Sequence, residues 1–339
     1  TSTDNSVTYN GDWAPGEFVT IWKTDNPGVS GSNQITIPTT GGGYNYNVDW
    51  GDGNTSVGHT GDATHTYASV GTYTVKISGV FPRISFWAVT DKQKILTVEQ
   101  WGNNQWASMS YAFSSASNLT IDSEDAPNLN TSTDITGIFS GASSMNSNIN
   151  HWNVSYVTNM SRAFNNASTF NQPLNNWDVS NVTRMELMFQ GASVFNQSLN
   201  VWNVKNVQDM SLLFSNNSYN QPLNDWDISS ATVIVGMFSG NTVFNQPLNN
   251  WDTSSTVDMG SVFYGATSFN QSLASWDVSN VINMMSMFGG GSGLSTYNFD
   301  STLVSWSGQT LKNNLNFNAG TSKYCVSATE RQGIITNHS

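Results

Sequence analysis

Residues 174–195 read LNNWDVSNVTRMELMFQGASVF, and the apolar pattern of this stretch recurs along most of the chain. A phenylalanine returns every 24 or 25 residues, at Phe164, Phe189, Phe214, Phe238, Phe263 and Phe288. A tryptophan stands twelve residues before each of them, at Trp152, Trp177, Trp202, Trp226, Trp251 and Trp276. Such a period predicts a repeat protein in which each unit buries its apolar side chains against its neighbours.

The quoted unit also predicts local structure. The apolar spacing over residues 174–182 is that of a leucine-rich-repeat core and predicts a short strand around Trp177 to Val179. The apolar residues that follow recur at helical spacing, which predicts one or two turns of helix over Thr183 to Gln190, ended by Gly191. Eight units can be placed, starting near residues 101, 127, 152, 177, 202, 226, 251 and 276.

Residues 1–80 lack this period and read as short strands separated by turns. Apolar and polar residues alternate over Tyr44–Trp50, as a half-buried strand requires, and an antiparallel β-sandwich is expected. The blocks VDWGDG at 48–53, HTY at 65–67 and GTYTV at 71–75 resemble a PKD domain, an immunoglobulin-like sandwich. The resemblance implies a spacer or binding accessory.

The amino-acid sequence of the repeats resembles a second family. Met-Phe-x-Gly-Ala-x-x-Phe-Asn-Gln-Pro-Leu-Asn-Asn-Trp-Asp-Val-Ser-Asn-Val is similar to the BspA-like leucine-rich repeats of bacterial surface proteins, over roughly residues 95–320. This resemblance implies a secreted or surface-displayed protein associated with adhesion. The tail around Cys325 resembles the closing segment of that family, and whether an anchor follows Ser339 stays open.

The expected fold is therefore mainly β with short helices. It comprises a PKD/immunoglobulin-like β-sandwich at 1–80, a leucine-rich-repeat-type solenoid at 81–320, and a C-terminal cap or truncated tail at 321–339.

Composition restricts the partners. The net charge is -12 with only 11 Lys and Arg, too few for the basic surface that nucleic acid requires. No apolar run is long enough for a spanning helix, so no membrane insertion is expected in this segment. The chain begins without a signal-peptide pattern, which indicates that a signal is absent or already removed.

A polar column provides the candidate binding site. Alternate side chains of the expected strands should face outward beside the buried Trp and Val, and stack from unit to unit. The predicted ligand-binding residues are His151, Asn153, Asp178, Asn203, Lys205, Asp225, Asp227, Asp252 and Asp277. The alternative reading is that these Asp and Asn side chains only hold the local turn by bonding to nearby backbone amides.

Two further groups of residues invite an interpretation. The asparagine of Phe-Asn-Gln recurs and is expected to satisfy the amides of adjacent turns, at Asn171, Asn196, Asn220, Asn245 and Asn270. Asp49, Asp52 and Asp62 offer oxygen ligands for calcium, although Asp-Gly is equally explained by hairpin geometry.

Motifs of catalysis are absent from the sequence, which has no G-x-S-x-G, H-E-x-x-H or Walker loop. The sequence predicts a binding protein and not an enzyme: a secreted or bacterial cell-surface adhesin or recognition module that takes a glycan or protein ligand. A self-associating surface-layer component is the alternative, and a carbohydrate-active enzyme is the least favoured.

Overall fold

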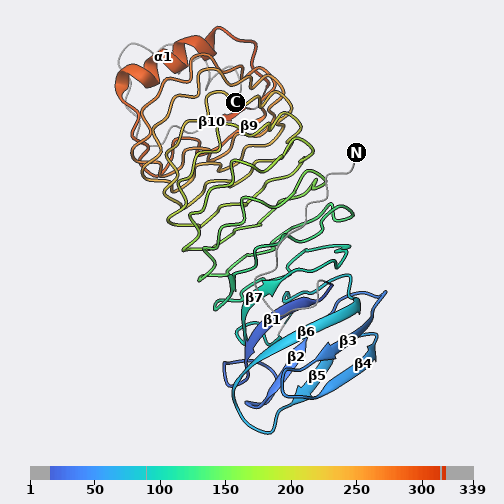
Figure 1. Cartoon of the computed structure of the whole chain (residues 1–339). Coiled ribbons are helices and arrows are strands. Elements are labelled where there is room, and N and C mark those ends of the chain that lie inside the picture. Colours follow the sequence, from blue (N-terminus) through green and yellow to red (C-terminus); the bar gives the residue numbers. More distant parts are fainter. Residues whose placement is uncertain (1–15, 89, 314, 318–339) are drawn as a thin grey trace.

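The computed structural model describes residues 16–88, 90–313 and 315–317. These residues form mainly β structure with one helix (Figure 1). A β-sheet region lies at one end, the 25-residue units follow in a row, and the helix lies at the other end (Figure 1).

Six strands form one mixed sheet in the order β4-β3-β6-β1-β7-β8. Its strands are β1 (Phe18–Lys23), β3 (Asn45–Asp49), β4 (Thr55–His59), β6 (Thr72–Val80), β7 (Ile95–Gln100) and β8 (Thr120–Ile121). Neighbours pair antiparallel except β7 and β8, which are parallel. A separate antiparallel pair consists of β2 (Gln34–Ile37) and β5 (Ala63–Thr66).

Aromatic residues connect this sheet to the first units. Phe18 of β1 is fully buried, and its ring lies 5.6 Å from Trp101 and 5.0 Å from Trp106. Trp101 in turn lies 5.3 Å from Trp152. The apolar core is therefore continuous from the sheet into the row of units.

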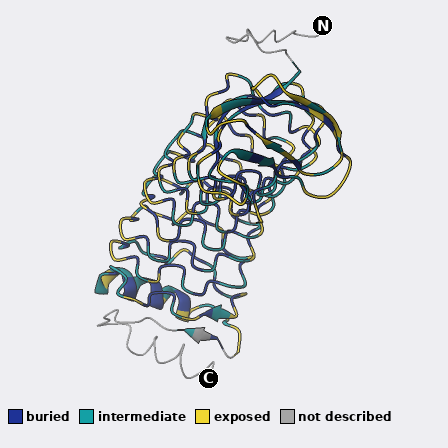
Figure 2. Ribbon diagram, turned by 90° about the horizontal axis from the view of Figure 1, so that it is seen from below, coloured by how far each residue is buried: buried dark blue, intermediate teal, exposed yellow. Residues whose placement is uncertain are grey.

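The units between Trp101 and Gly291, here called the repeat stack, lie side by side in register. Single parallel bridges join residues one period apart, from Asp134↔Asn159 to Asp258↔Asn283. The recurring phenyl rings stack with centroids 5.5 to 6.1 Å apart between Phe139 and Phe288. In Figure 2, stretches of buried residues recur along the units, and exposed residues are frequent at the outer bends. Burial of these rings supplies the main driving force for stacking.

Indole hydrogen bonds fix the register further. In six successive positions, a tryptophan Nε1 donates to a carbonyl oxygen of the preceding unit at 2.8 to 3.1 Å. Trp202, for example, donates to Leu174 at 2.9 Å. Each of these carbonyls also accepts a backbone amide of its own unit, as Leu174 does from Trp177 at 3.1 Å, so the indole adds a second hydrogen bond that joins two units.

The segment predicted to be helical is instead a chain of turns. Leu187 has a φ of 61° and Gly191 a φ of 67°, so left-handed residues interrupt any helix. The amides of alternate residues in this segment donate to the next unit, as from Leu187 to Ser211 and from Phe189 to Leu213. The intervening amides bond within their own unit, as from Met188 to the Met185 carbonyl. The same arrangement recurs from Met109 to Gly265, always directed toward the following unit.

The predicted fold class is consequently wrong. Trp177 to Val179 is not a strand and Thr183 to Gln190 is not a helix, so no unit has the strand-and-helix form of a leucine-rich-repeat solenoid. The sheet region is not a PKD domain either, because β7 and β8, from beyond residue 80, complete a six-stranded mixed sheet. The domain limits at residues 80 and 320 stay a prediction, and the tail at 321–339 lies outside the described residues.

The far end of the stack carries different elements. Strand β9 (Asn283–Met284) pairs in parallel with β10 (Asn316–Phe317). Helix α1 (Thr296–Ser307) begins after Ser295, whose hydroxyl accepts from the amide of Asn298. The indole of Trp306 donates to Leu273, so the helix continues the tryptophan pattern of the units.

Candidate functional site

The polar column contains the nine residues predicted to bind a ligand. All of them are exposed except Asp277, which is half-buried. They alternate with buried residues: exposed Asn153 lies between buried Trp152 and Val154, for example. The column is therefore accessible on one side of the repeat stack and anchored on the other by its apolar neighbours.

Most members of this column also stabilise their own turn. In Asn153, Asp178, Asn203, Asp227, Asp252 and Asp277, the Oδ1 atom accepts the backbone N–H of the residue two positions later, at 2.9 to 3.3 Å. Asparagine and aspartate make this bond equally, because it requires only a side-chain oxygen. The structural reading of the column thus has direct support, and it accounts for one oxygen of each side chain.

Serine hydroxyls keep three of the carboxylates ionised. The hydroxyl of Ser229 donates to Asp227 at 2.6 Å, and together with the amide of Ser229 it lowers the pKa of Asp227 below its usual value. Bonds from the hydroxyl and amide of Ser254 likewise lower the pKa of Asp252. Asp178 has a lowered pKa for the same reason, through Ser180. The column is therefore negatively charged at neutral pH.

Neighbouring units bring the remaining column residues close together. Lys205 Nζ lies 4.0 Å from Asp227 Oδ2, and Asn200 donates to Asp225 Oδ2 at 3.0 Å. His151 Nε2 lies 3.2 Å from the Asp125 carbonyl oxygen. Asp225, Asp227 and Asp252 thus place carboxylates on two consecutive units, with Lys205 on the preceding one.

The asparagine column has the structural role that the sequence suggests. Asn171 Oδ1 accepts the amide of Asn196, Asn196 Oδ1 that of Asn220, and Asn220 Oδ1 that of Asn245, at 2.9 to 3.0 Å. These side chains are half-buried or exposed and not fully buried. They join consecutive units through hydrogen bonds that the backbone alone does not make.

The three candidate calcium ligands are not brought together. Asp49 pairs with Lys76 at 3.2 Å, and Asp52 with His65 at 2.9 Å. Asp62 accepts from the amide and hydroxyl of Thr39, both at 2.7 Å. Residues 16–88, 90–313 and 315–317 include no group of three or more His, Cys, Asp or Glu side chains placed to hold a metal ion. These carboxylates stabilise turns and pair with neighbouring side chains instead.

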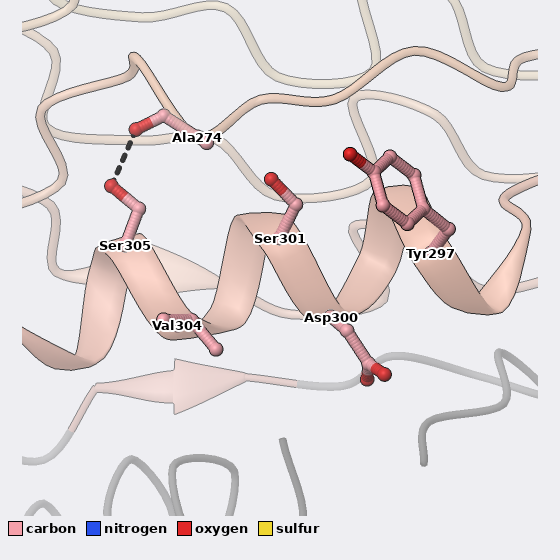
Figure 3. Close-up of a pocket in the computed structure, with 6 residues that line it drawn as sticks. All are labelled: Ala274, Tyr297, Asp300, Ser301, Val304 and Ser305. Carbon is pink, nitrogen blue, oxygen red and sulfur yellow. Dashed lines mark hydrogen bonds between the residues drawn. The ribbon is translucent and has the colours of Figure 1, made fainter. Parts of the chain in front are cut away.

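Helix α1 borders a hollow of about 440 Å³ at the far end of the stack. In Figure 3, Ser301, Ser305 and Tyr297 project from the side of α1 that faces Ala274, whereas Asp300 and Val304 project from the other side. Ser305 donates to the Ala274 carbonyl oxygen at 2.5 Å. This hydrogen bond fastens the helix to the preceding unit, and the surroundings are mostly apolar, so the hollow offers little chemistry.

A second hollow lies where the sheet region meets the first units, and sequence reasoning missed it. Its volume is about 320 Å³, and it is lined by Thr40, Arg83, Ser85, Trp87, Ser108, Ser110 and Tyr111. The available signal was Trp87, a tryptophan outside the 25-residue period.

Comparison with known proteins identifies one family. Residues 107–221 and 212–328 match the family model described as "Mycoplasma protein of unknown function, DUF285". No curated protein and no solved structure matches the chain. The family found is thus not the BspA-like leucine-rich repeats, and that predicted resemblance is wrong. In the described part of the chain, no helix is long and apolar enough to cross a membrane.

Proposed function

We propose that this chain, which belongs to the DUF285 family of proteins of unknown function, is an extracellular recognition module. It binds a glycan or protein of a target surface through the polar column and catalyses no reaction. We place it in the secreted or cell-surface compartment, where such recognition takes place.

The exposed, ionised carboxylates of the column carry the proposal. Turn formation explains the Oδ1 contacts of Asp227 and Asp252, but it requires no charge, since Asn153 and Asn203 make the same bond. Consecutive units nevertheless present Asp225, Asp227 and Asp252 to solvent. Lys205 offsets only one of these three carboxylates, so the group is net negative and is suited to a ligand with cationic groups or with several hydroxyl donors.

Charge-removing substitutions that keep the turn provide the test. The triple variant Asp225→Asn, Asp227→Asn, Asp252→Asn retains an Oδ1 acceptor at each position. Binding of the soluble chain is measured on an array of glycans and matrix proteins, followed by dissociation constants for each hit. We expect the triple variant to lose about tenfold or more in affinity, with only a small decrease in melting temperature at neutral pH, from the loss of the charge-assisted bonds of Asp227 and Asp252.

A matched control removes the same number of charges elsewhere. Asp134, Asp209 and Asp258 form equivalent Oδ1-to-amide turns in another, half-buried column. Their replacement by Asn should leave binding close to that of the parent chain. Equal losses in both variants would show a general effect of net charge, and an unaffected first variant would place the binding site outside the column.

A further inference from the structure

Trp87 differs from every other tryptophan that the structure describes. It is 66% exposed, whereas the others in residues 16–88, 90–313 and 315–317 are at most 4% exposed. Leaving a large aromatic side chain in water forgoes the stabilisation that its burial would provide. An exposed tryptophan at the edge of a hollow therefore indicates a surface that another molecule covers.

The second ring of this surface is held rigidly. The Tyr111 ring lies 4.1 Å from that of Trp87, with an angle of 46° between their planes. Its backbone is fixed on both sides, because its carbonyl accepts from Phe86 at 3.0 Å and its amide donates to Thr136 at 2.7 Å. Tyr111 also lies against Gly137, where a Cβ atom would stand 2.4 Å from the ring. The aromatic pair is thus positioned before any ligand arrives, which lowers the entropic cost of binding.

The rest of the hollow is rich in hydrogen-bonding groups. Thr40, Ser85, Ser108 and Ser110 line it, together with the guanidinium of Arg83. Arg83 Nε is buried and has no hydrogen-bond partner among the described residues. A Cβ atom on Gly41 would lie 2.5 Å from Arg83 Nη1, so the absence of a side chain at Gly41 leaves space for the guanidinium. The guanidinium carries further N–H groups, and because Arg83 lines the hollow it can donate to a ligand oxygen that enters there.

We propose that this hollow is a carbohydrate-binding site, which takes one sugar ring stacked on Trp87. The apolar face of the ring covers the indole, and its hydroxyls exchange hydrogen bonds with the serines, Thr40 and Arg83. A sugar suits the lining because each hydroxyl both donates and accepts, as serine and threonine hydroxyls do. A proline-rich peptide would also stack on aromatic rings, but it would leave most of the polar groups in the lining unpaired. The site is separate from the polar column and does not depend on it.

Saturation-transfer NMR on the full chain with cellotetraose, maltotetraose and chitotetraose tests the proposal. We expect at least one of them to receive saturation at its ring protons. Trp87→Ala should weaken this binding by about tenfold or more, and Trp87→Phe should restore part of it. Arg83→Gln should weaken it while keeping the aromatic platform. Tyr156→Ala, which removes another exposed aromatic ring on the repeat stack, should bind as the parent does.

Two outcomes would overturn the proposal. One is that none of the three sugars binds in a manner that Trp87→Ala removes, with a melting curve showing that the variant is folded. The other is that hexaproline binds in a Trp87-dependent manner and the sugars do not.

Discussion

Replacing Trp202 by phenylalanine should destabilise the protein more than the same replacement at Trp152. Both side chains are buried at equivalent positions of their units. Trp202 Nε1 donates to the Leu174 carbonyl at 2.9 Å, whereas no described residue accepts from Trp152 Nε1. Each substitution removes part of a buried ring, but only Trp202→Phe also removes a hydrogen bond, which leaves the Leu174 carbonyl with the amide of Trp177 at 3.1 Å as its one partner.

The difference follows from the hydrogen bond alone. One intramolecular hydrogen bond contributes about 0.5–1.5 kcal/mol net, whereas Trp152→Phe removes a donor that was already unsatisfied. We therefore expect Trp202→Phe to lower the free energy of unfolding by about 1 kcal/mol more than Trp152→Phe. Urea unfolding followed by far-ultraviolet circular dichroism measures this, because the signal comes mainly from the backbone amides and not from a single indole, and equal m-values make the midpoints comparable. A loss at Trp152 equal to or larger than that at Trp202 would refute the role of the indole bonds.

Three further changes probe other parts of the repeat stack. Serine hydroxyls lower the folded-state pKa of Asp178, Asp227 and Asp252. The stability that these three carboxylates contribute is therefore fully present above the unfolded pKa of about 4, and it is lost as the pH falls through the lower folded-state pKa values. Melting temperatures between about pH 5 and pH 2 should accordingly depend less on pH when all three are replaced by Asn. Asn220→Ala removes the acceptor of two hydrogen bonds from the next unit, at 3.0 and 3.1 Å, and should cost about 1–2 kcal/mol in urea unfolding without changing ligand affinity. Leu187→Gly removes a side chain from a left-handed residue, and since relieved strain of about 1–2 kcal/mol opposes the backbone entropy of glycine, the free energy of unfolding should change by less than about 1 kcal/mol.

Each of these has an outcome that contradicts it. An unchanged pH profile in the Asp-to-Asn variant would mean that the carboxylates do not contribute to acid unfolding. Loss of ligand affinity in a stable Asn220→Ala protein would assign the asparagine column to binding. A cost of several kcal/mol for Leu187→Gly, comparable to Met188→Gly in the buried core, would show that the Leu187 side chain matters more than its backbone.

The period and the buried residues could be predicted from the sequence, but the backbone of each unit could not. Trp177, Val179 and Phe189 are buried as the spacing requires. The prediction of a helix over Thr183 to Gln190 was wrong because the apolar spacing of residues 185–189 fits a helix and a chain of turns equally well. Glycine stands at 137 and 236, which align with Leu187 in other units, and all three have positive φ values. That alignment was the available indication of a left-handed residue.

The candidate sites were likewise predictable from the sequence only in part. The outward position of the polar column follows from its alternation with Trp and Val, and the turn-holding alternative considered for it accounts for the Oδ1 contacts. The hollow beside Trp87 could not be predicted, because it joins Thr40, Arg83 and Tyr111 from segments far apart in the chain. Only long-range packing brings such residues together.

The periodic amide bonds between units have an evolutionary consequence. Each unit donates one set of amides to its successor, as Leu187 does to Ser211, and a further amide to its predecessor, as Thr183 does to Thr158, and both sets recur along the repeat stack. A duplicated unit inserted between two others would therefore find matching donors and acceptors on both sides. Deletion of a unit would likewise bring together two units whose backbone donors and acceptors match. Genetic gain or loss of whole units can change the length of the molecule in fixed increments, while the sheet at one end and the helix at the other are kept.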